Sequence, residues 1–476
     1  MAKLDLSKYT IYRLRYILGY TFIGLLLTGL LVFVGFYLPG GLSALEMTAV
    51  VRSTALSLSD PSTLAISNLP YYALQSLILH TFGITLFTIK LPSLILALLS
   101  AIGFILLLRR WFKPNIAVLT SLIAITTGQF LFIAQQGAPG ILYVFWPVAL
   151  LLLGTQITRG KKFRLLWKVL FAITAALSLY TPLSIYPLIA IALATVLHPH
   201  LRNAVRKLSK IRLTAVLIIF LAVLAPLVYG IVINPQLGLT LLGIPSVWPP
   251  DFGANSITVL KQYFAFWLPG TTTLMTPVFG LGSVILILLG VYRIIRTRET
   301  TRSYLIIIWV VCLAPVLLFN PAFTSVTFVP SMLLLAAGLT SLIGYWYRLF
   351  PLNPYARITG LIPIVILVFA LSVSGIARYV YGYHYSPTQA ALFSKDLALL
   401  PKDTKEIVVS DDEKDFYTAV AQYRAGIKVV AQPTADMFIV TRDARKNFEG
   451  YEVSRIITNS HANEADRLYI YKKIAN

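Results

Sequence analysis

Carboxylates are scarce in the first 379 residues of this 476-residue chain, where only five occur. Three of them, Glu46, Asp60 and Asp251, lie between apolar runs in segments that carry few basic residues. A carboxylate that is partly removed from water can act as a general base or can bind a nearby cation. We therefore expect any acid–base chemistry of these segments to depend on one of the three, and Glu46, close after the first apolar run, is the first candidate.

Each of these acids also has a structural interpretation. Glu46 would then be an interfacial charge that pairs with Arg52 on the same predicted helix. Asp60 precedes Pro61, and Asp251 lies between a Pro-Pro and a Phe-Gly sequence, which are contexts typical of turns and helix caps. The residue types alone therefore leave both interpretations open.

Basic and amide side chains in the same segments are candidate binding groups. Lys90, Arg52 and Lys261 could each face a phosphate. Lys90, at the start of an apolar run, could equally extend its ammonium group to a membrane interface. Gln135 and Gln136 end another apolar run and are either ordinary interface residues or hydrogen-bonding groups for an acceptor or sugar. Asp251 is a further candidate for binding an acceptor or sugar.

The sequence contains no motif for a metal or a nucleotide cofactor. Its five histidines lack the spacing of metal ligands, and no Walker or dinucleotide-binding motif is present. The acidic residues 411–413 follow a predicted strand, a position typical of a solvated loop that caps a helix. We therefore predict neither a metal site nor a cofactor.

Composition and charge identify a membrane protein. Hydrophobic residues make up 57% of the chain and the mean hydropathy is +0.78, which is unusual for a soluble protein of this length. The net charge of +22 lies entirely in residues 1–379, which hold 27 basic and 5 acidic residues, whereas residues 380–476 hold 13 of each. Membrane orientation and anionic lipids explain this excess, so no nucleic-acid partner is predicted.

The hydropathy pattern predicts a polytopic α-helical protein with about 11 transmembrane helices, since a span takes about 20 apolar residues. Six short segments hold 23 of the 40 Lys and Arg residues and lie at every second gap between apolar runs. Cytoplasmic loops retain such residues, so we expect the N-terminus in the cytoplasm and the C-terminus outside. The spans are expected at about 16–38, 89–108, 115–134, 141–158, 165–180, 184–198, 213–234, 275–292, 303–319, 326–347 and 358–379. The basic segments are 3–15, 109–113, 159–168, 202–212, 293–302 and 348–357.

Two domains follow from this pattern. Residues 1–379 form a transmembrane domain, in which 42–83 carries two helices, at 43–58 and 69–82, that are expected to lie in the membrane interface. Residues 380–476 form a small soluble extracytoplasmic α/β domain. Its elements are expected to be helices at 388–400 and 415–424 and strands at 406–410, 428–431, 437–441, 451–458 and 468–472.

The order of these features resembles a known family. A first span leads into an outer loop with a carboxylate and two flat helices, and a Phe82-Gly83 turn and a Lys90-Leu91-Pro92-Ser93 sequence follow. The next spans end in an Arg-Arg-Trp-Phe sequence at 109–112 and an Ile-Ala-Gln-Gln-Gly-Ala-Pro sequence at 133–139. This order, with a weaker similarity at 328–339, resembles the GT-C membrane glycosyltransferases, which include protein O-mannosyltransferases and aminoarabinose transferases.

The resemblance implies a multi-pass enzyme of the plasma membrane that takes a sugar from a polyprenyl phosphate. The acceptor would be an extracytoplasmic glycan, lipid or protein. In the family an acidic residue of the first outer loop is the base and basic side chains neutralise the phosphate. Carried over to this sequence, this implies Glu46 as the catalytic acid with Asp60 in reserve, and Lys90, Arg52 and Lys261 at the phosphate.

The sequence also departs from the family pattern. The family carries Asp-Glu early in the first outer loop, where this chain has Leu45-Glu46. Gln135-Gln136 and Pro139-Gly140 stand where an Arg and an Asp are common. These departures keep an alternative open, in which the chain binds a lipid-linked glycan or acts as an envelope assembly scaffold without catalysis. A transporter is disfavoured, because internal repeats and ionisable residues in the middle of spans are lacking.

Overall fold

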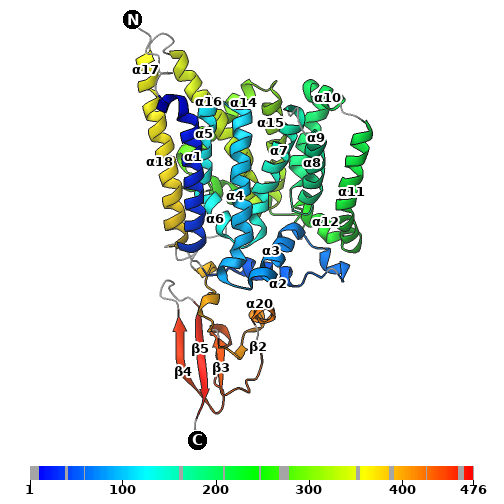
Figure 1. The fold of residues 1–476 in the computed structure, drawn as a ribbon, viewed down its shortest axis with the longest axis vertical. Coiled ribbons are helices and arrows are strands. Elements are labelled where there is room, and N and C mark those ends of the chain that lie inside the picture. The colour runs from blue at the N-terminus through cyan, green and yellow to red at the C-terminus, as the bar shows by residue number, and fades with distance from the viewer. Residues whose placement is uncertain are drawn as a thin grey trace.

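The computed structural model describes a bundle of helices with a small sheet at one end (Figure 1). It describes residues 10–37, 41–57, 59–159, 164–206, 210–245, 248–266, 278–349, 354–384, 391–401, 403–424, 426–458 and 466–474. The larger helices of the bundle are α1 (Thr10–Val32), α4 (Leu86–Trp111), α5 (Pro114–Thr126), α6 (Gly128–Gln135), α7 (Leu142–Arg159), α8 (Arg164–Ser178), α9 (Ile185–Leu197), α11 (Lys210–Ile233), α14 (Leu281–Arg296), α15 (Thr301–Phe319), α16 (Phe328–Leu349) and α18 (Leu361–Tyr379). Four shorter helices are α10 (Pro199–Arg206), α12 (Pro235–Leu242), α13 (Phe252–Phe264) and α17 (Pro354–Thr359).

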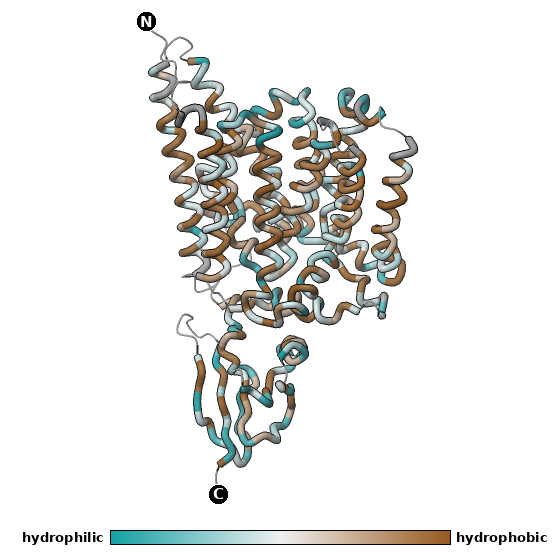
Figure 2. The backbone as a smooth tube through the Cα atoms, viewed as in Figure 1, coloured by the Kyte–Doolittle hydropathy of each residue, from teal (hydrophilic) through white to brown (hydrophobic). Residues whose placement is uncertain are grey.

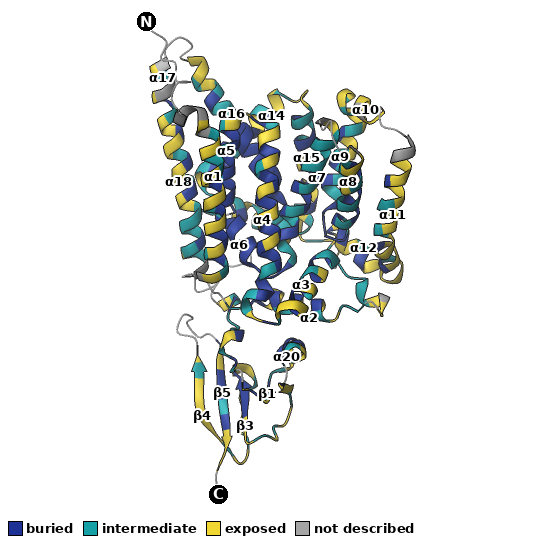
Figure 3. Cartoon of the chain, in the orientation of Figure 1, coloured by how far each residue is buried: buried dark blue, intermediate teal, exposed yellow. Residues whose placement is uncertain are grey.

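Each predicted span overlaps a helix of this bundle. Seven helices in the described part of the chain are long and apolar enough to cross a membrane. The pair α5 and α6, bent by 54° at their junction, passes the same test when the two are taken as one broken span. Figure 2 shows the apolar residues as a broad band along these helices. The helix α16 is the most enclosed of the seven, whereas few residues of α11 and α18 are buried (Figure 3). The chain is therefore an integral membrane protein.

The two ends of the bundle differ in charge and in what covers them. The helix ends that carry the basic segments, such as the end of α14 and the start of α15, lie far from the sheet (Figure 1). The opposite end carries α2 (Ala44–Thr54) and α3 (Leu69–Phe82). Their bounds are close to those predicted for the two helices of the first outer loop, 43–58 and 69–82. The gap between the spans predicted at 213–234 and 275–292 contains α12 and α13, and part of it lies outside the described residues.

The C-terminal region folds as a five-stranded sheet in the order β2-β1-β3-β5-β4. β1 is parallel to β2 and β3, whereas β5 is antiparallel to β3 and β4. One helix, α20 (Asp411–Tyr423), lies between the sheet and α2 (Figure 1). The strands are β1 (Glu406–Val408), β2 (Lys428–Val429), β3 (Met437–Thr441), β4 (Tyr451–Thr458) and β5 (Arg467–Lys473).

The first outer loop and the C-terminal domain share one hydrophobic core. Val50 of α2 and Leu79 of α3 are buried in the same cluster as Phe416 and Val420 of α20. Burial of such side chains contributes roughly 1.5–3 kcal/mol each, so the two regions stabilise each other. This shared core positions α2, and therefore Glu46, against the C-terminal domain.

Two predictions for the C-terminal domain were wrong. No long helix covers 388–400 within the described residues 391–401, because the backbone of Lys395 pairs with that of Leu42 and a 3-10 turn, η7 (Leu397–Leu399), follows. The acidic residues 411–413 are not a solvated loop but the first turn of α20, after the N-cap Ser410. Glu413 is buried there because it pairs with Lys395.

Candidate functional site

Glu46 is fixed locally by a capping box at the start of α2. In the Ser43-Ala44-Leu45-Glu46 sequence, the side chains of Ser43 and Glu46 each accept a hydrogen bond from the backbone N–H of the other. The backbone N–H and the hydroxyl of Ser43 donate to Oε2 of Glu46, at 2.8 and 3.1 Å, and the N–H of Glu46 donates to the Ser43 hydroxyl. The sequence therefore begins the helix at this point and turns the carboxylate inward.

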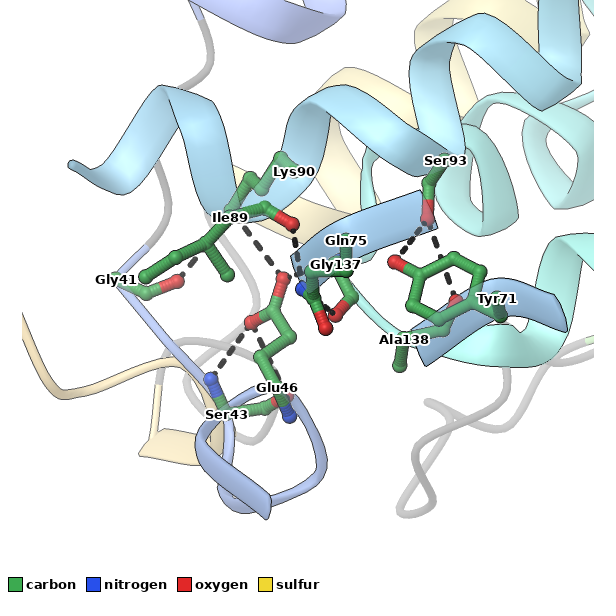
Figure 4. A network of polar contacts seen from close by, with 10 residues as sticks. All are labelled: Gly41, Ser43, Glu46, Tyr71, Gln75, Ile89, Lys90, Ser93, Gly137 and Ala138. Carbon is green, nitrogen blue, oxygen red and sulfur yellow. Dashed lines mark hydrogen bonds and ion pairs between the residues drawn. The ribbon is translucent and has the colours of Figure 1, made fainter. Parts of the chain in front are cut away.

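The second carboxylate oxygen of Glu46 connects α2 to two distant segments (Figure 4). The backbone N–H of Gly137 donates to Oε1 at 2.6 Å, and Nζ of Lys90, in the second turn of α4, lies 3.7 Å from the same oxygen. Both charged side chains are buried, with Glu46 fully enclosed and Lys90 only 4% exposed. An ion pair that is removed from water in this way is held in one geometry by its hydrogen bonds.

Glycine at position 137 allows this close approach. A Cβ atom on Gly137 would lie 2.9 Å from the carbonyl oxygen of Ile89, closer than side chains are found to backbone. The loop therefore touches α4 while its N–H reaches Glu46. The Lys90 ammonium group completes the arrangement by donating to the carbonyl of Gly41 at 3.4 Å, with the Phe393 ring centroid 5.8 Å away.

Sequence reasoning missed Gln75, which holds the same segments together. Its amide N–H groups donate to the carbonyls of Ile89 and Gly137, at 3.0 and 3.4 Å, and its oxygen accepts from Ser53 at 2.6 Å. Tyr71, one turn earlier on α3, forms a hydrogen bond with Ser93 at 2.9 Å (Figure 4). The available signal was the presence of these two polar side chains four residues apart, on one face of a predicted helix.

Gln135 and Gln136 lie beside this network, because they directly precede Gly137. Gln135, the last residue of α6, is fully buried, and within the described part of the chain neither its amide nitrogen nor its oxygen has a hydrogen-bond partner. An unpaired buried amide costs about 1–3 kcal/mol.

The other two predicted acids cap helices at exposed positions. Asp60 accepts from the N–H and hydroxyl of Ser62 at the start of η3 (Pro61–Leu64), and these hydrogen bonds lower the pKa of its carboxyl group. Asp251 accepts from the N–H of Ala254 at the start of α13. The structural interpretation of both acids is confirmed.

Two predicted cations are exposed and lie outside the buried network. Arg52 donates to the hydroxyl of Tyr72 at 3.4 Å, so the expected pairing of Glu46 with Arg52 was wrong. The pairing fails because six residues of α-helix place Arg52 about 120° around α2 from Glu46. Lys261, in the last turn of α13, has no carboxylate within ion-pair distance among the described residues.

The arrangement offers a charge pair and hydrogen-bonding groups rather than a metal centre. Within the described part of the chain, no group of three or more His, Cys, Asp or Glu side chains could hold a metal ion. A buried carboxylate can take a proton from a hydroxyl group, and an ammonium group beside it can balance the charge of a phosphate. The site therefore suits displacement chemistry with a phosphate leaving group.

Comparison with known proteins identifies the fold. No protein-family model and no curated protein sequence matches the chain. The structure of ArnT from Cupriavidus metallidurans bound to undecaprenyl phosphate matches with a TM-score of 0.54 and 13% identity, over 94% of this chain and 97% of ArnT. The oligosaccharyltransferase of Archaeoglobus fulgidus, tethered with an acceptor peptide, matches with a TM-score of 0.52 and 13% identity, over 88% of this chain and 64% of its own.

A second structure of the archaeal enzyme, AglB in complex with an inhibitory peptide and a dolichol-phosphate, has a TM-score of 0.51 and 14% identity. The match covers 87% of this chain and 64% of AglB, so this chain spans less than two thirds of the length of AglB. Both neighbours are glycosyltransferases with the GT-C fold. The predicted fold of this chain, a GT-C fold, is thereby confirmed.

Proposed function

We propose, from the GT-C fold of this chain, that it is a membrane glycosyltransferase that moves a sugar from a polyprenyl-phosphate donor to an extracytoplasmic acceptor. The observation that carries the proposal is the buried pair of Glu46 and Lys90, whose charged groups lie 3.7 Å apart at the end of the bundle near the sheet. The structural neighbours bind undecaprenyl phosphate and dolichol phosphate, which supports a donor of this class.

We propose that about eleven helices cross the plasma membrane, with the N-terminus in the cytoplasm and residues 380–476 outside. The shared position of the basic helix ends, far from the sheet, supports this orientation because cytoplasmic loops retain Lys and Arg. Residues 1–379 then form the transmembrane domain, with the Glu46 site at its extracytoplasmic surface. Arg52 and Lys261, both exposed, would meet lipid phosphates at that surface.

In the proposed reaction, the hydroxyl oxygen of the acceptor attacks the anomeric carbon of the sugar while Glu46 accepts the proton of that hydroxyl group. The bond from that carbon to the phosphate oxygen breaks, and the configuration at the carbon inverts. The lipid phosphate leaves with one more negative charge, which the Lys90 ammonium group balances. Gln135, with its unpaired amide, and Gln136 would donate to or accept from sugar or acceptor hydroxyl groups. Asp60 and Asp251, already used as helix caps, would have no part in the step.

One observation favours a second function, binding of a lipid-linked glycan without transfer. Both carboxylate oxygens of Glu46 already accept hydrogen bonds, from Ser43 and from Gly137, and the carboxylate also faces Lys90. A carboxylate with this many partners serves well as a structural anchor. As a base it has to exchange at least one of them for the acceptor.

A transfer assay in vesicles with a panel of polyprenyl-phosphate sugars separates the two functions. Catalysis predicts that Glu46→Gln lowers the rate of transfer by about 100-fold or more, as expected for loss of a general base. Asp60→Asn is the matched control, since it makes the same change on an exposed cap, and it should keep the wild-type rate. Unchanged transfer by Glu46→Gln would remove Glu46 from the base role. Tight binding of undecaprenyl phosphate by the wild-type protein, with no transfer from any donor, would establish the second function.

A further inference from the structure

A short segment of the C-terminal domain, residues 393–395, crosses the first outer loop beside the Glu46 site. Leu42 and Lys395 form an antiparallel bridge in which each backbone N–H donates to the carbonyl of the other. A Cβ atom on Gly41 would lie 2.4 Å from the carbonyl oxygen of Phe393 and 2.7 Å from that of Lys395. Only glycine at position 41 therefore allows the 393–395 segment to lie this close.

The same segment reaches Lys90 in two ways. The ring of Phe393, itself buried, faces the ammonium group with its centroid 5.8 Å from Nζ. The other contact is indirect, because Gly41, against which the segment lies, provides the carbonyl that accepts from Lys90. Phe393 also packs edge to face on Phe132 of α6, with ring centroids 6.0 Å apart, so its ring has little freedom to turn away.

The 393–395 segment is in turn held by the charged groups of the C-terminal domain. The ammonium group of Lys395 pairs with Glu413 of α20 and lies 2.7 Å from Oδ2 of Asp443 in η8 (Arg442–Ala444). The next backbone N–H, that of Asp396, donates to Asp466 beside β5 at 3.1 Å. The segment is thus attached to the helix, to a 3-10 turn and to the start of a strand of the small domain.

We propose that the 393–395 segment is a positioning element, through which the C-terminal domain holds the Lys90 ammonium group in place for the phosphate of the lipid donor. The inference rests on the proposed function, because that function makes Lys90 the phosphate ligand. It adds a role for the C-terminal domain. In this role the Phe393 ring holds the Lys90 ammonium group in position before the phosphate binds.

The test measures the affinity for undecaprenyl phosphate in nanodiscs, which needs no sugar transfer. Phe393→Leu removes the ring face and should weaken binding by about 3- to 10-fold, as expected for loss of a cation–π contact. Phe393→Tyr keeps the ring and should bind within about twofold of wild type. Phe438→Leu is the matched control, since Phe438 is also buried, in a separate hydrophobic cluster of the sheet, and its loss should lower the melting temperature without changing the affinity. Lys90→Met gives the affinity without the ammonium group.

A second measurement follows Lys90 itself, by reductive methylation and mass spectrometry, with the exposed Lys261 as internal reference. Phe393→Leu should raise the labelling of Lys90 relative to Lys261, whereas Phe393→Tyr should not. If Phe393→Leu does not fold, Lys395→Gln, which loosens the segment and keeps the ring, should weaken binding in the same direction.

The role of the segment would be overturned if Lys90→Met binds weakly while Phe393→Leu keeps the wild-type affinity. Where Lys395→Gln replaces Phe393→Leu, wild-type affinity in that variant has the same meaning. Either result leaves the proposed function intact. Wild-type affinity in Lys90→Met would remove Lys90 as the phosphate ligand, and the positioning role would fall with it.

Discussion

Two lysines, the buried Lys90 beside the 393–395 segment and the half-buried Lys395 within it, differ in the charge balance of their surroundings. Lys90 faces one carboxylate, Glu46, whose oxygens also accept hydrogen bonds from Ser43 and Gly137. Lys395 faces two carboxylates, Glu413 and Asp443, with Asp466 close by. The first cluster is neutral and well hydrogen-bonded, whereas the second carries excess negative charge. Excess negative charge in a buried cluster favours protonation of one of its carboxyl groups.

The largest expected difference between the two clusters is in the loss of one carboxylate. Glu46→Ala leaves the buried Lys90 ammonium group without its partner, which should lower the free energy of unfolding by about 3–5 kcal/mol. Glu413→Gln keeps the shape of the side chain, removes one negative charge from the second cluster and leaves Lys395 paired with Asp443, so the loss should be smaller, about 1 kcal/mol. Titration of both purified variants with SDS in mixed micelles measures these values. An equal loss in the two variants would mean that charge balance does not distinguish the clusters.

The next difference is in pH dependence. Burial, together with the negative charges of Glu413 and Asp396, raises the pKa of Asp466 from 3.8 to about 6, although Lys395 and the hydrogen bond from the backbone N–H of Asp396 oppose this shift. Because the folded protein holds this proton more tightly than the unfolded chain, the stabilisation is complete below pH 3.8 and is lost as the pH rises through 6. The total change is at most about 3 kcal/mol.

Asp466→Asn should therefore flatten the dependence of the melting temperature on pH between 5 and 7. The variant is expected to melt at the same temperature as wild type below pH 3.8, and at a temperature that exceeds that of wild type by a growing margin as the pH rises from 5 to 7. The exposed Asp412→Asn is the matched control and should retain the wild-type slope. A wild-type slope in Asp466→Asn would assign the pH dependence to another group.

The same two clusters mark how far the sequence could predict this molecule. The membrane helices, α3 and most strands follow from local hydropathy and periodicity, which depend on neighbouring residues. Glu46 was identified because carboxylates are rare outside the basic segments, and Lys90 was one of three candidate cations. The choice of Lys90 among them, and the contact with Gly137, depend on tertiary packing. The burial of Glu413 was missed for the same reason, because Lys395 approaches it from a segment predicted to be helical. The acids could therefore be identified from local sequence, whereas their partners depend on tertiary contacts.

The smallest effect contrasts two buried glutamines next to the Glu46 pair. Both nitrogen and oxygen of the Gln75 amide are hydrogen-bonded, whereas the Gln135 amide has no partner within the described residues. Gln75→Leu should therefore lower the free energy of unfolding by about 1–3 kcal/mol, while Gln135→Leu should leave it unchanged or raise it by about 1 kcal/mol. If the Gln135 amide binds the sugar or acceptor, Gln135→Leu should also lower transfer at unchanged stability. A stability loss in Gln135→Leu equal to that in Gln75→Leu would show that the amide is part of the structural network and is not held in readiness for a ligand.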